Sequence, residues 1–133
     1  MSGSRREARE RALGLCYELE VRELSVAVLL EQQPAPPDDY AVRLLEGVEA
    51  HQADVDSLLR KFSEHWALER MPAVDRAVLR LAAYELGWEP DIPNAVVISE
   101  AVELAKQYST KDSGRFVNGL LSRIAEELRP SAS

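Results

Sequence analysis

The stretch MPAVDRAVLRLAAYELGW, residues 71–88, decides the fold that the sequence predicts. Pro72 suits the first turn of a helix, where its fixed φ and missing N–H are tolerated, and the helix is expected to end near Gly87. Apolar residues occupy most of the circumference of this helix; they are Val74, Ala77, Val78, Leu79, Leu81, Ala82, Tyr84, Leu86 and Trp88. A helix that is apolar nearly all round lies in the middle of a bundle.

The polar side of this central helix is narrow and basic, because only Arg76 and Arg80 form it. Glu85, by contrast, falls inside the apolar arc. A buried carboxylate without a partner is costly. Glu85 is therefore expected to be paired or to lie at a contact surface, rather than to be buried alone.

The segments on both sides of the central helix also show helical spacing of apolar residues. Further helices are expected to begin near Ser4, Ser25, Asp38, Pro93 and Ser113. The stretch from Asp38 has one long apolar side and is expected to bend near His51. Aromatic residues are 6% of the chain and no strand alternation is found, so the predicted fold class is all-α.

Composition and isolated residues give little sign of catalysis. His51 and His65 have no neighbours at metal-ligand spacing, and no glycine-rich phosphate loop or dinucleotide fingerprint occurs. Cys16 falls on a predicted core face, so packing is expected of it rather than reactivity. A single cysteine, no membrane-length apolar run and no signal-peptide core predict a soluble cytoplasmic protein. We predict no metal, no cofactor and no enzyme activity.

The first helix carries a concentrated positive charge. Residues 1–11 hold four arginines and two glutamates in a chain with a net charge of −7. On a helical wheel, Arg6, Arg9, Leu13 and Tyr17 form a stripe beside the core face, and Arg11 points elsewhere. Arginine forks beside a tyrosine ring suit single-stranded nucleic acid. A solvated basic face with a tyrosine at the core edge explains the same pattern, and both interpretations stay open.

The last helix starts in the unusual segment STKDSGRFVNGLL, residues 109–121. Lys111 and Arg115 place positive charge at a helix N-terminus, which normally prefers negative charge but attracts anions. Phe116 lies at the edge of the core arc beside Gly119, which leaves room for a flat group or another helix. One interpretation makes Phe116 a stacking platform for a base. The other makes it a core residue, with Gly119 allowing close helix packing.

Three segments in order resemble the NusB family of transcription antitermination factors. They are ARERALGLCYELE (residues 8–20), MPAVDRAVLRLAAYEL (71–86) and AVVISEAVELAKQYSTKDSGRFVNGLL (95–121). The resemblance spans about residues 4–128. It implies two small helical bundles packed side by side in one NusB-like domain, residues 1–133, with an N-terminal subdomain of about residues 4–66 and a C-terminal one of about 67–130.

The resemblance also implies a function without catalysis. NusB proteins pair with NusE, a protein of the small ribosomal subunit, and the pair binds the boxA element of nascent RNA. With other Nus factors this lets RNA polymerase read through terminators, particularly in ribosomal RNA operons. Some family members form homodimers, which would cover the RNA site.

The family's functional positions can be carried over onto matching residues of this chain. Arg5, Arg6 and Arg9 match an arginine-rich segment that contacts RNA, and Tyr17 matches the tyrosine that follows it. Asp112 and Phe116 match the DS…FVNG motif on the RNA-binding side, and Arg115 adds charge there. For the central helix, the resemblance associates Asp75 and Arg80 with the NusE and RNA surfaces, and Glu85 is added as a candidate NusE contact. Glu7 interrupts the arginine run, which predicts weaker or more salt-sensitive RNA binding.

Two alternatives remain at this point. NusB-like helical domains also occur attached to RNA cytosine methyltransferases, so the chain could be a detached module of such a system. A purely structural homodimer that uses the apolar edge near residues 84–88 is the second alternative.

Overall fold

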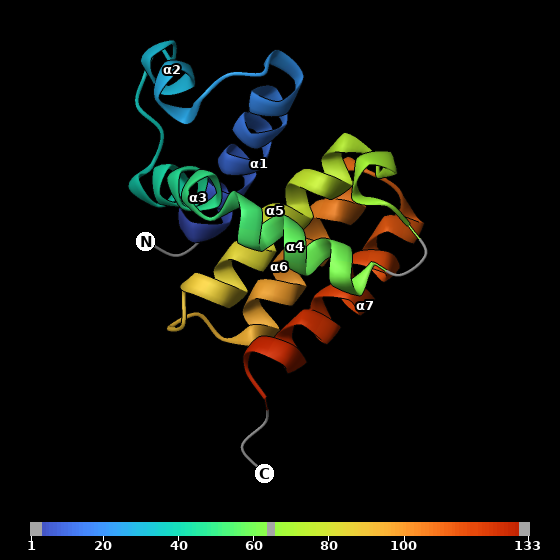
Figure 1. Cartoon of the computed structure of the whole chain (residues 1–133). Helices are drawn as coiled ribbons and strands as arrows, with labels where there is room; N and C mark the ends of the chain where they lie inside the picture. The colour runs from blue at the N-terminus through green and yellow to red at the C-terminus, as the bar shows by residue number, and fades with distance from the viewer. Residues whose placement is uncertain (1–3, 64–65, 131–133) are drawn as a thin grey trace.

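The computed structural model describes residues 4–63 and 66–130, so His65 and both ends of the predicted domain lie outside it. Within these ranges the chain is helical (Figure 1). The elements are α1 (Ser4–Arg22), α2 (Val26–Glu31), α3 (Asp39–Ala50), α4 (Gln52–Phe62), a 3-10 turn (Leu68–Arg70), α5 (Ala73–Trp88), α6 (Asn94–Tyr108) and α7 (Lys111–Leu128). The prediction of an all-α fold is confirmed.

Side chains named from the sequence begin several of these helices. The backbone N–H of Val28 donates to Ser25 Oγ at 3.3 Å, and that of Tyr40 donates to Asp38 Oδ1 at 2.9 Å. Such side-chain caps satisfy donors that the first helical turn leaves unpaired. The expected bend near His51 is also present, because α3 ends at Ala50 and α4 begins at Gln52.

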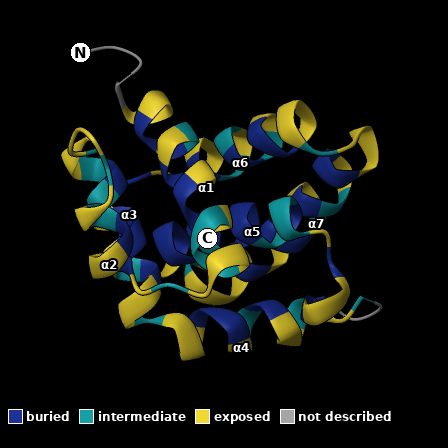
Figure 2. Cartoon of the chain, turned by 90° about the horizontal axis from the view of Figure 1, so that it is seen from above, coloured by how far each residue is buried: buried dark blue, intermediate teal, exposed yellow. Residues whose placement is uncertain are grey.

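The central position predicted for residues 71–88 is confirmed. α5 contacts α1, α3, α4, α6 and α7. In Figure 1, α2 and α3 lie at the left, α1 above the centre and α7 at the lower right, with α5 and α6 close together at the centre. Figure 2 shows α5 dark blue at the centre, where most of its residues are buried. Tyr84 of α5 packs so closely on α3 that a Cβ at Gly47 would lie 2.2 Å from its ring.

Buried hydrophobic side chains from all the α-helices belong to one continuous core cluster. α4 precedes the predicted subdomain boundary near residue 66, yet it packs against α5 and α7. The division at that residue stays a prediction, and packing alone places α4 with the C-terminal helices.

The start of α7 differs from the prediction. The helix begins at Lys111 rather than near Ser113, because the Thr110 side chain accepts the Ser113 N–H at 3.1 Å. Ser113 returns a contact to the backbone of Thr110, which makes a reciprocal capping box. Thr110 was not expected as the cap when the start was placed near Ser113. At the other end, Leu128 is exposed.

Candidate nucleic-acid interface

α1 brings three arginines to one end of the bundle, and each has a different environment. Arg5 is exposed, with its guanidinium carbon 4.6 Å from the centre of the Tyr40 ring, a cation–π distance. Arg6 reaches α6, where its Nε and Nη2 donate to the two carboxylate oxygens of Glu100 at 3.0 and 2.6 Å. The Arg6 side chain is nevertheless 65% exposed, so it stays accessible to solvent.

Arg9 does not lie on an exposed stripe, which corrects the wheel prediction. Its side chain is 6% exposed and its Nε and Nη2 donate to the Glu85 carboxylate at 3.0 and 2.8 Å. Tyr40 Oη donates to the same carboxylate at 2.6 Å. The pairing expected for Glu85 is thus confirmed, and its partner is the arginine assigned to RNA. A wheel of α1 alone cannot show that α5 packs beside Arg9.

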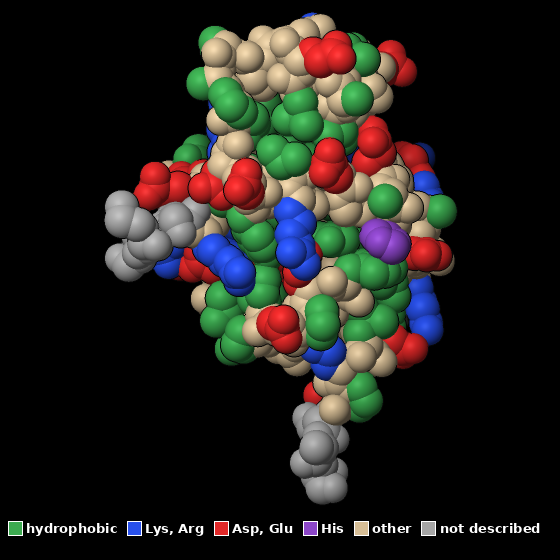
Figure 3. All heavy atoms as spheres, turned by 90° about the vertical axis from the view of Figure 1, so that its left-hand side faces the viewer, with side chains coloured by type: hydrophobic (Ala, Val, Ile, Leu, Met, Phe, Trp, Pro, Cys, Tyr) green, Lys and Arg blue, Asp and Glu red, His purple; other side chains and the backbone are tan. Residues whose placement is uncertain are grey.

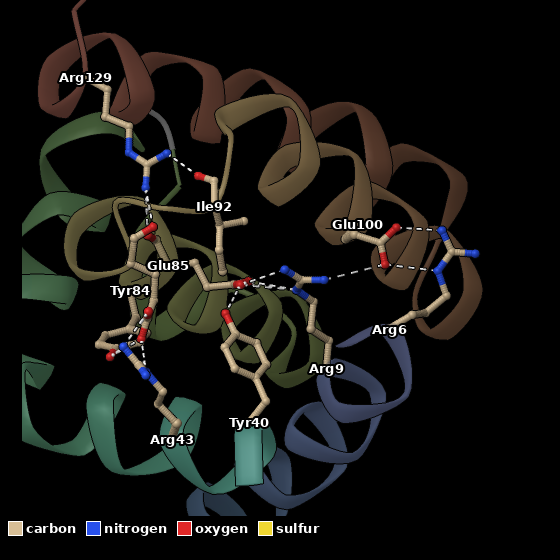
Figure 4. A network of polar contacts seen from close by, with 10 residues as sticks. Arg6, Arg9, Tyr40, Arg43, Tyr84, Glu85, Ile92, Glu100 and Arg129 are labelled. Carbon is tan, nitrogen blue, oxygen red and sulfur yellow. Dashed lines mark hydrogen bonds and ion pairs between the residues drawn. The ribbon is translucent and has the colours of Figure 1, made fainter. Parts of the chain in front are cut away.

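These contacts form one network of ion pairs and hydrogen bonds, shown in Figure 4. It runs from Arg6 through Glu100, Arg9 and Glu85 to Tyr40. The link between Glu100 and Arg9 is a longer ion pair of 3.9 Å. Burial lowers the pKa of Arg9, but the hydrogen bonds and charge of Glu85 outweigh it and raise the pKa overall. Burial and the bond to Glu85 likewise raise the pKa of Tyr40. Both groups therefore keep their protons at neutral pH.

Arg129 is a structural residue that was not predicted from the sequence. Its guanidinium donates to the carbonyls of Glu85, Leu86 and Glu89 at 3.1, 3.0 and 2.8 Å, at the C-terminal end of α5. The Glu85 carbonyl already accepts the Glu89 N–H, and the Glu89 carbonyl accepts the Ile92 N–H, so Arg129 adds further donors at this helix end. A cation there also interacts favourably with the helix dipole. The sequence signal was an arginine directly after the last helix, next to Pro130.

The predicted stripe of α1 divides into buried and exposed members. Leu13 is buried in the core, whereas Tyr17 is 42% exposed. Val21, one turn further on, is 60% exposed and was not singled out from the sequence. Arg6 and Tyr17 thus reach the surface, and the two residues between them stabilise the interior. On the face shown in Figure 3, lysine and arginine side chains lie among acidic ones instead of forming an unbroken basic patch.

The N-terminal end of α7 supplies a second charged surface. Lys111, Asp112 and Arg115 are all exposed. Lys111 and Arg115 line an open groove between α6 and α7, together with Lys106 and Asn118. Gly114 allows the two helices to approach, because a Cβ there would lie 2.7 Å from Lys106 Cγ. The charged side chains that line the groove are three cations and one carboxylate, Glu103, and the remaining lining is apolar or uncharged.

Phe116 lies on the other edge of α7 and is half-buried. Its ring meets the Trp66 ring edge-on, with 4.9 Å between centroids. A Cβ added at Gly119 would meet only Arg123 Nη1, at 3.9 Å. Gly119 therefore does not serve close helix packing in this structure. One part of the Phe116 ring contacts the core, and space is open beside it.

The three residues assigned to a partner surface lie mostly inside the protein, which is a further correction. Asp75 is fully buried and accepts a hydrogen bond from Ser113 Oγ at 2.8 Å. Glu85 is 2% exposed within the pair described above. Arg80 is 16% exposed, with its Nε donating to Asp56 Oδ1 at 2.9 Å. Polar groups on a central helix find their partners on the helices around it.

The described residues were also compared with the expectations about metal binding, a reactive cysteine and membrane-spanning segments. No cluster of three or more His, Cys, Asp and Glu side chains there is placed to hold a metal ion. Burial raises the pKa of the Cys16 thiol to about 11, so the nucleophilic thiolate is scarce at neutral pH. Among the same residues, no helix combines the length and apolar character needed to cross a membrane.

The fold and this surface define a class: an all-helical bundle that presents arginine, lysine and aromatic side chains at the N-terminal ends of two helices. Residues 6–126 match the model of the NusB family. The chain belongs to the NusB family, as the three sequence segments predicted. The match covers most of the chain and includes all of α5 and nearly all of α1 and α7.

Individual relatives agree with this assignment. Transcription antitermination protein NusB of Saccharopolyspora erythraea is 51% identical over 129 residues, which cover 92% of this chain and 87% of the relative. A T. maritima NusB structure is 40% identical with a TM-score of 0.84, covering 95% of this chain and 93% of its own. A chain in a structure of antitermination factors NusB and NusE in complex with dsRNA is 29% identical, with a TM-score of 0.82 and coverage of 96% and 99%. The relatives are named as a transcription factor and not as an enzyme, in agreement with the prediction.

Proposed function

We propose that this chain is a transcription antitermination factor that pairs with NusE and binds the boxA element of nascent RNA. Together with other Nus factors it would let RNA polymerase read through terminators in ribosomal RNA operons, in the cytoplasm. The observation that carries the proposal is the family match over residues 6–126, to a fold of which one solved example is a complex of NusB, NusE and dsRNA.

The proposed RNA surface uses the exposed members of the predicted set. Arg5 and Arg6 at the start of α1 are accessible cations, and guanidinium forks bind phosphate oxygens well. Arg115 at the start of α7 adds a further exposed cation beside the amides of a helix N-terminus. Tyr17 offers an exposed ring on which a base can stack. Arg9 supports this surface from inside, since it holds Glu85 and lies near Glu100.

Two residues of α7 have distinct proposed roles. Phe116 is proposed to stack a base with the part of its ring that Trp66 leaves free. Asp112 is proposed to restrain RNA binding, because an exposed carboxylate between Lys111 and Arg115 repels phosphate.

The NusE contact is proposed at the C-terminal end of α1, where Val21 is exposed beside a charged cluster. In that cluster Glu20 accepts from Arg76 and lies 3.5 Å from Arg80. An exposed apolar side chain next to paired charges suits a protein interface with a polar rim. Asp75 and Glu85 would act there only by holding the central helix in place.

One titration tests the proposal. RNA containing boxA and a scrambled RNA of equal length are titrated with the chain alone, with NusE alone and with the mixture, at a fixed salt concentration. The mixture is expected to bind boxA more tightly than the scrambled RNA, and more tightly than either protein alone. Equal affinity for both RNAs contradicts the proposal. Light scattering on the same samples distinguishes a heterodimer with NusE from a homodimer of this chain.

A further inference from the structure

Glu100 is a carboxylate from α6 that reaches the arginines of α1. Both of its oxygens accept hydrogen bonds from Arg6, at 3.0 and 2.6 Å, and Arg9 Nη1 lies 3.9 Å away (Figure 4). The two partners differ in exposure, because the Glu100 side chain is 13% exposed and that of Arg6 is 65% exposed. Glu100 thus lies beneath an arginine whose outer side faces solvent.

This contact has the geometry that Arg6 would use on RNA. A guanidinium binds a carboxylate and a phosphate through the same pair of parallel N–H donors. In the free protein, the Nε and Nη2 edge of Arg6 is filled by Glu100. A phosphate that takes this edge must displace the carboxylate.

The exchange is feasible at Arg6 and not at Arg9. An ion pair with an exposed partner is weak in water, so Arg6 can change partner at little cost. Glu100 would keep a second cation nearby, since Arg9 already lies within 3.9 Å. Moving Arg9 instead would leave the Glu85 carboxylate buried without its cation, which is strongly unfavourable.

From these contacts we propose that Glu100 is a positioning residue. In the free protein its carboxylate occupies the place of an RNA phosphate on Arg6, and RNA binding displaces it from Arg6. This proposal rests on the proposed RNA-binding function. Glu100 then lowers RNA affinity, because part of the attraction between Arg6 and phosphate is spent on releasing the carboxylate. It also reduces the salt dependence, since the freed carboxylate takes up a cation as the phosphate releases one.

The Glu100→Gln variant tests this inference in the complex with NusE. The amide keeps the size of the side chain and removes its charge. RNA affinity is expected to rise about two- to fivefold, the range of an exposed ion pair. The plot of log affinity against log salt concentration is expected to steepen by up to about 0.9, the value for one additional phosphate contact.

Two controls separate this role from bulk charge and from a structural effect. Glu103→Gln removes a carboxylate of the same helix whose side chain is 65% exposed and which pairs only with Lys106, at 3.7 Å, among the ion pairs of the described residues. It is expected to change affinity and salt slope less than Glu100→Gln does. In an Arg6→Ala background, Glu100→Gln is expected to have no effect on affinity, which a general loss of structure would not produce.

The outcomes distinguish the two proposals. Weaker or unchanged RNA binding by Glu100→Gln overturns the inference, and so does an equal gain from Glu103→Gln. If the unchanged chain with NusE does not prefer boxA to scrambled RNA, the proposed function fails. The inference survives that failure only if Glu100→Gln still binds RNA more tightly and with a steeper salt slope. If no variant binds RNA, both fail.

Discussion

Arg6 and Arg9 lie one helical turn apart on α1 and both pair with a glutamate, yet their environments are opposite. The Arg9–Glu85 pair is enclosed, with side chains 6% and 2% exposed. In the Arg6–Glu100 pair the arginine is 65% exposed. Buried pairs are costly to break because one partner is left charged without water, whereas exposed pairs exchange freely with solvent and ligands. The comparison therefore divides a uniform arginine segment into a structural residue and a recognition residue.

The largest expected effect is the loss of the buried pair. Arg9→Ala leaves Glu85 buried with Tyr40 as its remaining side-chain partner, so the free energy of unfolding should fall by about 3–5 kcal/mol. Urea unfolding followed by circular dichroism measures this loss. Arg6→Ala is the matched control, and it should change the free energy of unfolding far less than Arg9→Ala does while weakening RNA binding. Equal stability losses from the two variants would refute the comparison.

A double variant sharpens this point. Arg9→Met combined with Glu85→Leu removes both charges and should recover most of the stability that Arg9→Ala loses, since no uncompensated charge remains. Failure to recover would mean that shape and the Tyr40 contact, rather than charge pairing, dominate at this position.

The second effect concerns Tyr40, which is half-buried and donates to the buried Arg9–Glu85 pair. Tyr40→Phe removes the hydroxyl that donates to Glu85 Oε2 at 2.6 Å and should lower the free energy of unfolding by about 1.5–3 kcal/mol. Tyr84→Phe removes a similar bond to Glu89, which pairs with the exposed Arg43, so a smaller loss is expected. Thermal melts of both variants make the comparison. The Tyr84–Glu89 bond is itself buried and the Tyr40–Glu85 bond is part-buried, so a larger loss at Tyr84 would show that burial of the hydroxyl, rather than of the paired arginine, decides the loss.

The sequence predicted the fold well because the features that define each helix depend on the spacing of residues within a single segment. The apolar circumference of residues 71–88, the caps at Ser25 and Asp38 and the bend at His51 are each properties of one segment. The start of α7 was misplaced by two residues because Thr110 pairs with Ser113, a less familiar capping box than one that ends in glutamate.

The candidate site was predicted less completely, since it depends on which helices meet. Arg6 and Glu100 are 94 residues apart in the chain, and only the packing of α1 near α6 joins them. The sequence did show that Glu85 needs a partner. It could not show that this partner is Arg9, because the wheel of each helix omits its neighbours. Asp75 was likewise assigned to a surface although α7 covers it.

Phe116 is intermediate between the two environments compared above, because its ring is half-buried against Trp66. Phe116→Leu should lower the free energy of unfolding by about 1 kcal/mol, the value of an aromatic pair, and should also weaken boxA binding about fivefold or more through lost stacking. Unfolding curves and RNA titrations on the same preparation separate the two effects. A stability loss without any loss of RNA affinity would assign Phe116 to the core alone.

Asp112 is fully on the exposed side of this comparison. Asp112→Asn should bind RNA as well as the unchanged chain or more tightly, by a few-fold at most. The change removes a negative charge between Lys111 and Arg115, and it leaves the Thr110 cap of α7 intact. The measurement is a titration at two salt concentrations, because a gain that comes from charge should be smaller at high salt. A clear loss of affinity would indicate a direct hydrogen bond from the carboxylate to a base.

The smallest expected effect is a pH dependence of stability at the exposed pair. The hydrogen bonds and charge of Arg6 hold the pKa of Glu100 below its ordinary value. Since the folded pKa lies below the unfolded value of about 4.3, the stabilisation is complete above that pH and is lost as the pH falls through the folded pKa. Unfolding measured at steps from pH 6 to pH 3 should therefore show a shallower decline for Glu100→Gln than for the unchanged chain. Arg6→Ala should flatten the same part of the curve, because it removes the cation that lowers this pKa. If only Glu100→Gln flattens it, the depressed pKa comes from Arg9, and the Arg6 contact contributes nothing to stability.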